Sequence, residues 1–435
     1  MRFQKVKGMR DIFEEDWKLF EKIEKACGEI GAFYGYKRIE TPILEFKGLF
    51  EKGTGANTDI VEKQMFVLKT KGGDCLALRP EETAPVVRAY LENGMENQPK
   101  PVKLWYFGPM FRYERPQAGR WRQFYQFGFE ALGAGSWAID AQIIQIVYNV
   151  LKSIGLTDLV VEINSIGDFQ CRPYYKKSLT AYLRKRKNSL CPDCQRRLRT
   201  NPLRVLDCKQ ENCQTVLKEA PQSLDYLCDD CRKHFKNLLE SLEELSLPYN
   251  LNPRLVRGLD YYTRTVFEII SKPENREASN NALVGGGRYD ALVKLLGGKD
   301  TPACGAAGGA ERVIALIKEK GGGKRKLDYQ KKREIFIAQV GELAKKKSLS
   351  LIEEFRANKI PTASAVDRDS LSVQLKLANK AGAAYVLIIG QKEALEEKVI
   401  VKDMKLGRQK TIALNKIVRE MKKVLKSSTK SKAKR

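Results

Sequence analysis

Two segments of the sequence concentrate the side chain types that bind phosphates and carboxylates. The stretch LVRGLDYYTRTVFEI, residues 255–269, places two guanidinium groups, a carboxylate and two phenols within eight positions, directly before β-branched and aromatic residues. Those residues are typical of a half-buried strand. Because Gly258 permits a tight turn and a close backbone approach, the polar side chains could face a cavity. An exposed hairpin edge, which its charges protect from aggregation, is the alternative.

The second segment is FRYERPQAGRWRQF, residues 111–124, with four arginines in eleven positions and aromatic residues between them. Arginine offers a planar, always-charged fork that matches phosphate and carboxylate groups. Aromatic side chains can stack on a nucleic-acid base. The pattern therefore fits a nucleotide site, and an ordinary basic surface hairpin is the alternative.

The histidine content limits the chemistry. Among 435 residues the chain has one histidine, His234. Ser/His and Cys/His catalysis and histidine-rich metal sites are therefore excluded. We expect His234 on a helix surface, not at a metal. The net charge of +26 predicts a polyanionic partner.

The N-terminal sequence has no apolar segment of signal-peptide length, and no later run approaches the roughly 18 apolar residues of a membrane span. In a reducing compartment, the ten cysteines favour thiols or metal ligands over a disulfide framework. We therefore expect a cytoplasmic protein that does not associate with membranes.

Changes in composition divide the chain. Residues 168–247 are charged, helical in pattern and rich in cysteine, which predicts an inserted helical module. Residues 324–333 predict a flexible basic linker. Strands and helices alternate over 334–420, the pattern of a small α/β domain with a mainly parallel sheet. The Lys-rich residues 421–435 predict a disordered basic tail.

Two CxxC pairs in the module indicate a zinc site, because each pair can place two thiolates at one tetrahedral ion. Free buried thiols are the alternative. Cys208 and Cys213 lie between the pairs, as spare thiols or as an alternative ligand pair. No special chemistry is expected of Cys27, Cys75, Cys171 and Cys304. The predicted structural zinc ligands are Cys191, Cys194, Cys228 and Cys231.

Five motifs resemble the histidyl form of the class II aminoacyl-tRNA synthetases, over about residues 5–415. YGYKRIETPILE resembles motif 1, FRYERPQAGRWRQFYQFGFEALG motif 2 and GAAGGAERVIAL motif 3, while RGLDYYTRTVFE and LVGGGRYD resemble the two histidine signature peptides. The resemblance implies an antiparallel catalytic sheet with helices, built from residues 1–167 and 248–323. It also implies an α/β anticodon-binding domain over 334–420 and a homodimer formed through motif 1.

The activity that the resemblance implies is ATP-dependent formation of histidyl adenylate, followed by transfer of histidine to the 3′ end of tRNA(His). A carboxylate is already ionised at neutral pH, so the first step needs no general base, which agrees with the single histidine. It needs charge stabilisation and positioning. Arg112 and Arg257 would lie on either side of the α-phosphate as the catalytic pair. With Mg²⁺ bridging the phosphates, the ATP contacts would be Arg112, Glu114, Arg120, Phe124 under the adenine, and Arg312 at the γ-phosphate.

The resemblance also assigns the amino acid pocket. Glu81, Thr83 and Gln126 would hold the α-ammonium group of histidine. Glu130 and Tyr262 would meet the two imidazole nitrogens, with Tyr261 beside them, and pairing both nitrogens rejects substrates that lack them. Glu82 stands where the family usually has glycine; its side chain is expected to point away from the site.

Two alternative interpretations assign the chain to other classes of protein. The synthetase-like regulatory subunit of ATP phosphoribosyltransferase typically lacks a C-terminal anticodon domain and the catalytic positions, whereas this chain keeps both. A nucleic-acid-binding protein built around a zinc module leaves the two signature peptides unexplained.

Overall fold

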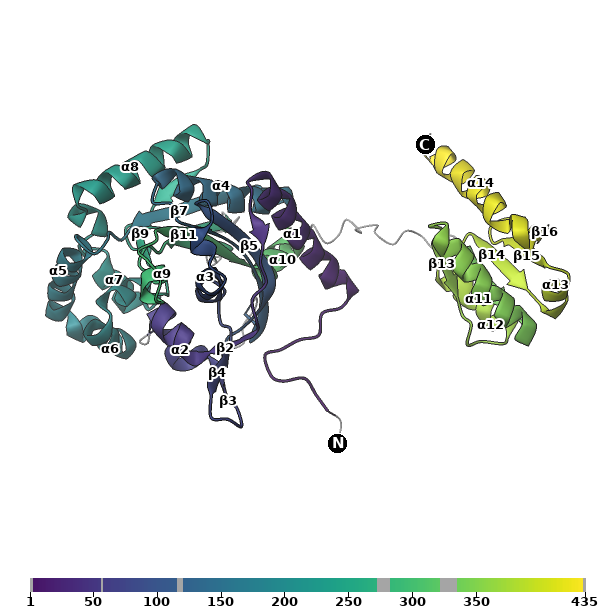
Figure 1. The fold of residues 1–435 in the computed structure, drawn as a ribbon, viewed down its shortest axis with the longest axis horizontal. Coiled ribbons are helices and arrows are strands. Elements are labelled where there is room, and N and C mark those ends of the chain that lie inside the picture. The colour runs from purple at the N-terminus through teal and green to yellow at the C-terminus, as the bar shows by residue number, and fades with distance from the viewer. Residues whose placement is uncertain (1–2, 56–57, 116–119, 272–281, 321–334, 433–435) are drawn as a thin grey trace. The chain divides into compact units, whose positions relative to one another are not determined.

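The computed structural model describes residues 3–55, 58–115, 120–271, 282–320 and 335–432, with side chains described through residue 425. The chain divides into two compact units, Met1–Lys324 and Arg325–Arg435 (Figure 1). The predicted linker, 324–333, lies outside the described residues.

An eight-stranded sheet forms the centre of the first unit. The strand order is β1-β5-β6-β11-β10-β9-β7-β8, antiparallel from β5 to β7 and parallel at both edges. This sheet confirms the predicted fold class. The strands are Lys37–Arg38 (β1), Val102–Phe111 (β5), Gln123–Leu132 (β6), Leu159–Ser165 (β7), Tyr249–Leu251 (β8), Thr263–Ser271 (β9), Val284–Arg288 (β10) and Ala303–Gly309 (β11).

Alternation along the strands separates an apolar face from a polar one. On β6, Phe127 and Phe129 are fully buried in the main hydrophobic cluster. Phe124 and Gln126 point to the other side, because successive side chains of a strand face opposite ways. One short sequence therefore supplies both core packing and a functional surface.

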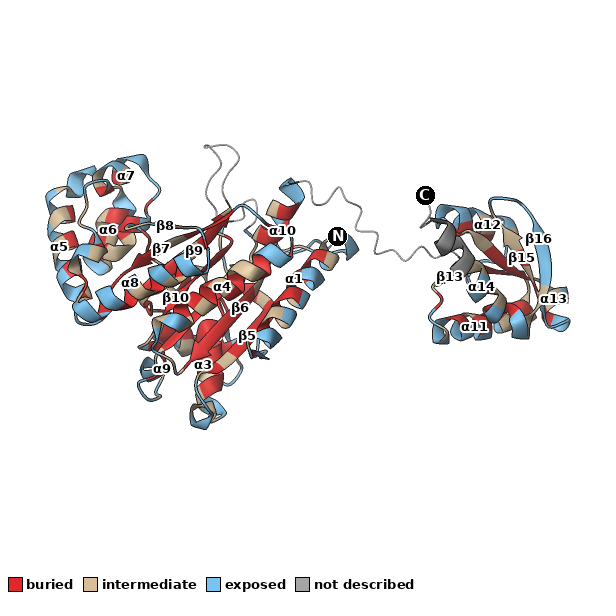
Figure 2. Cartoon of the chain, turned by 90° about the horizontal axis from the view of Figure 1, so that it is seen from above, coloured by how far each residue is buried: buried red, intermediate tan, exposed pale blue. Residues whose placement is uncertain are grey.

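Four helices cover the apolar face (Figure 2). Their buried side chains, among them Phe20 and Ile144, join the strand phenylalanines in one cluster. Ser136 caps α4, since its Oγ accepts a hydrogen bond from the Ala138 amide at 3.2 Å. The helices are Glu14–Phe33 (α1), Trp137–Ser153 (α4), Asp229–Glu244 (α8) and Ala310–Glu319 (α10).

Smaller elements pack on the polar face. A three-stranded sheet has the order β2-β4-β3, with strands Leu44–Phe46 (β2), Phe66–Lys69 (β3) and Cys75–Leu78 (β4). Short helical turns span 51–55, 60–64 and 95–97. The helices here are Lys47–Phe50 (α2), Thr83–Glu92 (α3) and Leu292–Leu295 (α9).

The cysteine-rich segment folds as helices. Besides α8, these are Arg172–Lys185 (α5), Pro192–Thr200 (α6) and Glu211–Leu217 (α7), with 3₁₀ turns at 187–189, 202–207 and 223–226. Leu179 and Leu198 share a hydrophobic cluster with Tyr261 and Tyr262. The module therefore packs directly against the peptide that carries these tyrosines.

The second unit is a five-stranded sheet with four helices. Its order is β13-β12-β14-β15-β16. β12 pairs in parallel with β13 and β14, but the hairpin β15–β16 is antiparallel, so the sheet is mixed and not mainly parallel as predicted. Its elements are Ile335–Gln339 (β12), Glu342–Ala357 (α11), Thr362–Ser364 (β13), Leu371–Lys380 (α12), Tyr385–Ile389 (β14), Gln391–Leu395 (α13), Lys398–Asp403 (β15), Gln409–Ala413 (β16) and Leu414–Lys432 (α14).

The last helix differs from the predicted disordered tail. α14 continues to Lys432, through most of the 421–435 segment. Met421 is buried beside Ile417 and Val418, which extends the apolar face of the helix into the predicted tail. None of the helices within the described ranges is long and apolar enough to cross a membrane.

Candidate functional site

A pocket opens on the polar face of the large sheet. Residues from motif 2, motif 3 and both signature peptides line it, although they are up to about two hundred positions apart in the sequence. The predicted site residues on its wall are Glu81, Thr83, Arg112, Glu114, Arg120, Phe124, Gln126, Arg257, Tyr261, Tyr262 and Arg312.

Glu130 is the predicted site residue that the wall does not include. Its side chain is buried, and its carboxylate accepts hydrogen bonds from Thr83 at 3.0 Å, Tyr106 at 3.4 Å and Tyr289. Burial raises the pKa of Glu130 to about 8, against the lowering effect of the Tyr289 and Thr83 hydroxyls. Its direct contact with the imidazole stays a prediction; in the structure the Glu130 carboxylate is held by hydroxyl groups of residues that line the pocket.

Four arginines converge on the pocket. Desolvation by burial lowers the pKa of both Arg112 and Arg312, and the neighbouring arginines add to the lowering. Arg112 is fixed by donating from Nε to the Pro80 carbonyl at 2.8 Å, and Arg312 by donating to the Ala282 carbonyl at 2.9 Å. Guanidinium groups that repel one another in a partly buried pocket are suited to a polyanionic ligand.

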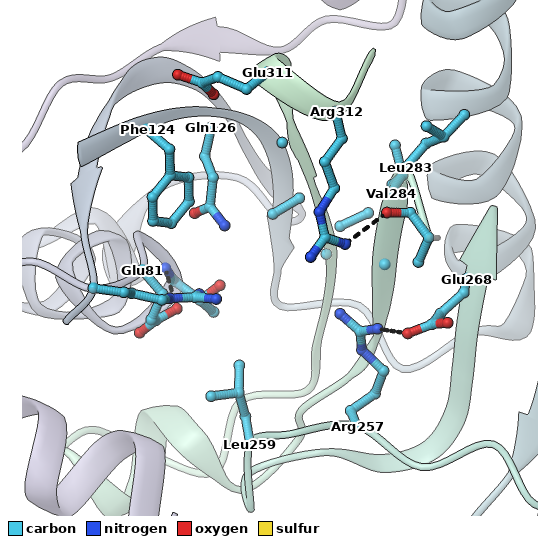
Figure 3. Close-up of a pocket in the computed structure, with 18 of the residues that line it drawn as sticks. Glu81, Phe124, Gln126, Arg257, Leu259, Glu268, Leu283, Val284, Glu311 and Arg312 are labelled. Atoms are coloured by element: carbon cyan, nitrogen blue, oxygen red, sulfur yellow. Dashed lines mark hydrogen bonds and ion pairs between the residues drawn. The ribbon is translucent and has the colours of Figure 1, made fainter. Parts of the chain in front are cut away.

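Arg257 approaches from the segment that precedes β9, on the same side of the pocket as Arg312 (Figure 3). Its guanidinium group pairs with the Glu268 carboxylate. Burial works to lower the pKa of Arg257, but the ion pair with Glu268 prevails and raises it. A Cβ at Gly285 would overlap the guanidinium group of Arg257, so a side chain there would require the arginine to move.

Polar groups at the start of α3 form a second corner of the pocket. The Glu81 carboxylate accepts the backbone N–H groups of Thr83 at 2.8 Å and Ala84 at 3.0 Å, which fixes its position. Burial raises the pKa of Glu81. The Oε1 atom of Gln126 is buried without a hydrogen-bond partner, and Gln126 lines the pocket. An unsatisfied acceptor beside a fixed carboxylate is suited to an ammonium donor.

Three tyrosines form the deeper wall. The rings of Tyr261 and Tyr262 have centroids 4.6 Å apart, and those of Tyr261 and Tyr289 are 5.6 Å apart. All three side chains are buried, and burial raises the pKa of each phenol. The phenols therefore stay protonated at neutral pH, as donors and acceptors for a flat polar ring.

Four titratable residues of the pocket had no predicted role: Tyr106, Glu268, Tyr289 and Glu311. Strand alternation could have indicated Glu268, since it lies on a strand otherwise rich in apolar residues. Tyr289 belongs to the quoted LVGGGRYD peptide, but no role was assigned to it. Glu311 accepts the Tyr125 amide at 2.9 Å, and burial raises its pKa to about 7.

Glu82 faces away from the pocket, as predicted. Its Oε1 accepts hydrogen bonds from Arg79 at 3.0 Å and from the Thr41 hydroxyl at 2.8 Å. Arg79 is itself fully buried. The residue that replaces the usual glycine is thus part of a buried ion pair under α3.

The cysteines group differently from the prediction. Cys191 and Cys194 lie with Cys208 and Cys213, whereas Cys228 and Cys231 lie with Asp168 and Cys171; within each group all ligand atoms are within 4.8 Å of one another. The predicted set of two CxxC pairs is therefore wrong as one site. Spacing identifies each pair but not its partner, which depends on the path of α5 to α8.

His234 is buried, not on a helix surface as expected. Its Nε2 lies 2.8 Å from Asp140 Oδ2. Asp140 also accepts hydrogen bonds from Thr265 at 2.7 Å and from Arg288, which has no exposed surface. This network joins α4, α8, β9 and β10 behind the pocket, and its groups are structural.

A largely antiparallel sheet that presents arginines from several motifs to one pocket is the catalytic architecture of a class II aminoacyl-tRNA synthetase. The sequence matches the family Histidyl-tRNA synthetase over residues 8–313 and the family Anticodon binding domain over residues 334–424. The chain belongs to the histidyl-tRNA synthetase family.

Similar proteins agree along nearly the whole chain. The histidine–tRNA ligase of Dehalococcoides mccartyi is 44% identical over 421 residues, covering 97% of this chain and 99% of that protein. That of Thermodesulfovibrio yellowstonii is 44% identical over 418 residues, covering 96% and 98%. The structure of apo histidyl-tRNA synthetase from S. aureus has a TM-score of 0.78 and 35% identity, covering 96% of this chain and 99% of that one.

A structure described as an ATP phosphoribosyltransferase regulatory subunit/histidyl-tRNA synthetase, from Bacillus halodurans, shares the fold, with a TM-score of 0.63 and 21% identity over 90% of this chain and 99% of that one. The regulatory-subunit alternative typically lacks the anticodon domain that this chain matches over 334–424.

Proposed function

We propose that this protein is a histidine–tRNA ligase, which activates L-histidine with ATP and transfers it to the 3′ end of tRNA(His). The observation that carries the proposal is the convergence of four arginines on a pocket that also offers a carboxylate, an unpaired amide oxygen and phenols. The full-length similarity to histidine–tRNA ligases supports the same assignment.

In the first step, the histidine carboxylate attacks the α-phosphorus of ATP, and pyrophosphate leaves. No proton is removed from the nucleophile, so the enzyme acts by positioning and by stabilising charge. We assign Arg112 and Arg257 to the α-phosphate as the catalytic pair. The hydrogen bond from Arg112 to Pro80 and the ion pair of Arg257 with Glu268 hold both guanidinium groups in place before ATP arrives.

The other predicted nucleotide contacts line the same pocket. Phe124 would lie against the adenine, Glu114 and Arg120 would complete the nucleotide site, and Arg312 would hold the γ-phosphate. Carboxylates among the arginines, such as Glu114, fit a Mg²⁺ ion that takes few protein ligands and several waters. When bound with ATP, Mg²⁺ neutralises phosphate charge.

Histidine would bind at the corner formed by the start of α3 and the tyrosines. Glu81, Thr83 and Gln126 would bind the α-ammonium group, and Tyr261 and Tyr262 would border the imidazole. Glu130 and Tyr262 would meet the two imidazole nitrogens, with the Glu130 carboxylate held by the hydroxyl groups of Thr83, Tyr106 and Tyr289.

Histidine-dependent exchange of labelled pyrophosphate into ATP tests this function. We expect exchange that requires L-histidine and is not supported by other amino acids, because only histidine satisfies the buried partners of both ring nitrogens. Folded protein without histidine-dependent exchange would refute the proposal.

The nucleic acid partner and the assembly are part of the proposal. The second unit would bind the anticodon, and the +26 net charge favours the polyanion. Since tRNA charging accompanies translation, we place the protein in the cytoplasm.

A homodimer would cover the exposed apolar side chains of the small sheet, Leu44, Phe46, Val67 and Leu68. Sedimentation equilibrium at the mass of one chain, 49.4 kDa, would contradict the dimer.

We also propose a structural zinc ion at Cys191, Cys194, Cys208 and Cys213. The four sulfurs lie within 4.8 Å of one another, and no disulfide joins any of the ten cysteines, all of which are described. Four thiolates suit a closed structural zinc site. Metal analysis should find zinc that Cys208→Ser loses; a folded variant that keeps all its zinc would contradict this site.

A further inference from the structure

The second ligand cluster, Asp168, Cys171, Cys228 and Cys231, lies where the helical module meets the catalytic sheet. Asp168, Cys171 and Cys231 are buried, and Cys228 is partly exposed. The carboxylate Oδ1 of Asp168 lies 3.5 Å from Cys171 Sγ and 3.9 Å from Cys228 Sγ. One oxygen and three sulfurs thus face a common point.

The sulfur spacing matches a tetrahedral metal. Cys171 Sγ and Cys231 Sγ are 3.8 Å apart, and so are Cys191 Sγ and Cys208 Sγ in the first cluster. Thiolates around one zinc ion lie about 3.8 Å apart, because each Zn–S bond is about 2.3 Å long. A disulfide requires about 2.05 Å. Both clusters therefore have the spacing of ligands that share an ion.

The local backbone repeats the same design in both clusters. Cys191 precedes α6 and Cys228 precedes α8 as the N-cap residue, so each CxxC pair lies at a helix N-terminus. There the helix dipole favours negative charge, which a thiolate carries. In each cluster a backbone N–H also donates to a sulfur: that of Cys191 to Cys213 Sγ at 3.2 Å, and that of Asp168 to Cys171 Sγ at 3.3 Å.

We propose that Asp168, Cys171, Cys228 and Cys231 form a second structural zinc site, which holds the histidine signature peptide in its active conformation. Zinc accepts carboxylate oxygen beside thiolates in such sites, and a tetrahedral set of four closes the coordination. Metal binding here is independent of the proposed enzyme activity, whereas the effect on the signature peptide rests on that activity.

The site connects directly to the pocket. Arg264 donates to Asp168 Oδ2 at 3.2 Å, and Arg172, next to Cys171, donates to the Tyr262 carbonyl at 2.9 Å. Arg264 has a φ of 50°, a strained conformation for a residue with a side chain, which its surroundings must hold. Asp168 would bind the ion through one carboxylate oxygen and accept the hydrogen bond from Arg264 through the other. A second contact of this kind orients a ligand at a metal site.

Gly167 fits the same arrangement. Its φ is +67°, and a Cβ there would lie 2.5 Å from Cys171 Sγ. The loop therefore closes around the sulfur, and the Arg264 amide donates to the Gly167 carbonyl at 2.8 Å. Hydrogen bonds thus connect both Tyr262 and Arg264 to residues 167–172, the segment that carries two of the proposed zinc ligands.

The first experiment uses the wild-type chain. We expect metal analysis to find two zinc ions per chain, and zinc-edge X-ray absorption to find fewer than four sulfurs per zinc on average, with oxygen in the first shell. Alkylation mapped by mass spectrometry should label Cys228 only after chelation, whereas Cys75, equally partly exposed and outside both clusters, should be labelled throughout. One zinc per chain, none, an all-sulfur average, or free labelling of Cys228 would overturn the proposal.

Variants then separate the two sites. Cys228→Ser should lose one zinc and keep the other, Cys208→Ser should do the reverse, and Cys75→Ser should keep both. Cys228→Ser should also raise the KM for histidine by about tenfold, and Cys208→Ser by less than about threefold. A folded Cys228→Ser variant with two zinc ions would overturn the site; one with a single zinc ion and an unchanged KM would keep the site and overturn its effect on the signature peptide. If Cys228→Ser does not fold, the wild-type measurements decide.

Discussion

Replacing Arg257 by alanine should lower histidine-dependent pyrophosphate exchange by about 10²–10³-fold, equal to roughly 3–4 kcal/mol of transition-state stabilisation. Two effects add. The α-phosphate loses a fixed donor, and Glu268 loses its counter-ion and faces the nucleotide as an unpaired carboxylate. We therefore expect kcat to fall and the KM for ATP to rise. Histidine affinity should stay within about threefold, since Arg257 is assigned to the phosphate end of the pocket.

The chain offers a matched control for this variant. Arg254 lies three positions earlier in the same segment, is exposed, and hydrogen-bonds to Gln214 outside the pocket. Arg254→Ala should leave exchange unchanged. Equal losses of histidine binding and of adenylate formation in Arg257→Ala would show that Arg257 supports the fold or the amino acid pocket instead.

Gly285→Ala tests the same position without removing a charge. The added methyl group would occupy the space of the Arg257 guanidinium group, which must then move. A loss of exchange that resembles that of Arg257→Ala would show that the placement of the charge matters, and not only its presence. A variant with wild-type exchange would show that Arg257 can act from a different position.

Arg112, Arg120 and Arg257 were predictable because each lies in a short segment whose composition already indicates a phosphate site, whereas Arg312 was indicated by the family resemblance alone. Arg112 and Arg257 come from separate motifs, and the family resemblance supplied what the segments lack, namely that both face one cavity. Alternation on β6 places Phe124 and Gln126 on the polar face for the same local reason. The predictions that rest on local spacing therefore agree with where the structure places these residues.

Predictions failed where the deciding contact is distant in sequence. His234 lies among charged helix residues, which suggests a surface position, but its partner Asp140 is 94 positions away. The CxxC pairs were recognised, but their third and fourth partners depend on how the helical module folds. Each error concerns tertiary pairing that no local pattern encodes.

The grouping of the cysteines into two clusters gives the helical module a different structural role from the one predicted. A single zinc ion shared by both CxxC pairs would only have held the helices together. In the observed grouping, the first cluster connects residues within the module. The second joins the start of the module to α8 and is linked through Arg264 and Arg172 to Tyr262. The inserted segment is therefore part of the support of the amino acid pocket.

Breaking the buried network of Asp140, His234, Thr265 and Arg288 should strongly destabilise the first unit. Arg288→Met should lower the free energy of unfolding by about 3–5 kcal/mol, because it leaves the Asp140 carboxylate buried without its main counter-charge. All four tryptophans, at positions 17, 105, 121 and 137, lie in this unit, so their fluorescence in urea reports its unfolding alone. Arg196→Met, at an exposed pair with Asp193, is the control and should change stability by less than about 1 kcal/mol.

The pH dependence identifies the charge that matters. Burial works to raise the pKa of Asp140, but Arg288 and His234 outweigh it and hold the pKa at about 2. A carboxylate with a depressed folded-state pKa stabilises the protein above its unfolded pKa of about 3.9 and loses that contribution as the pH falls through about 2. The stability difference between wild type and Arg288→Met should therefore be full while Asp140 is ionised in both folded proteins. It should shrink as the pH falls, from the point at which the unpaired Asp140 of the variant takes up a proton down to about pH 2. A difference that does not change with pH would assign the loss to packing around the arginine. Adding Asp140→Leu to Arg288→Met should recover part of the lost stability, because removing both charges costs less than leaving one buried and unpaired.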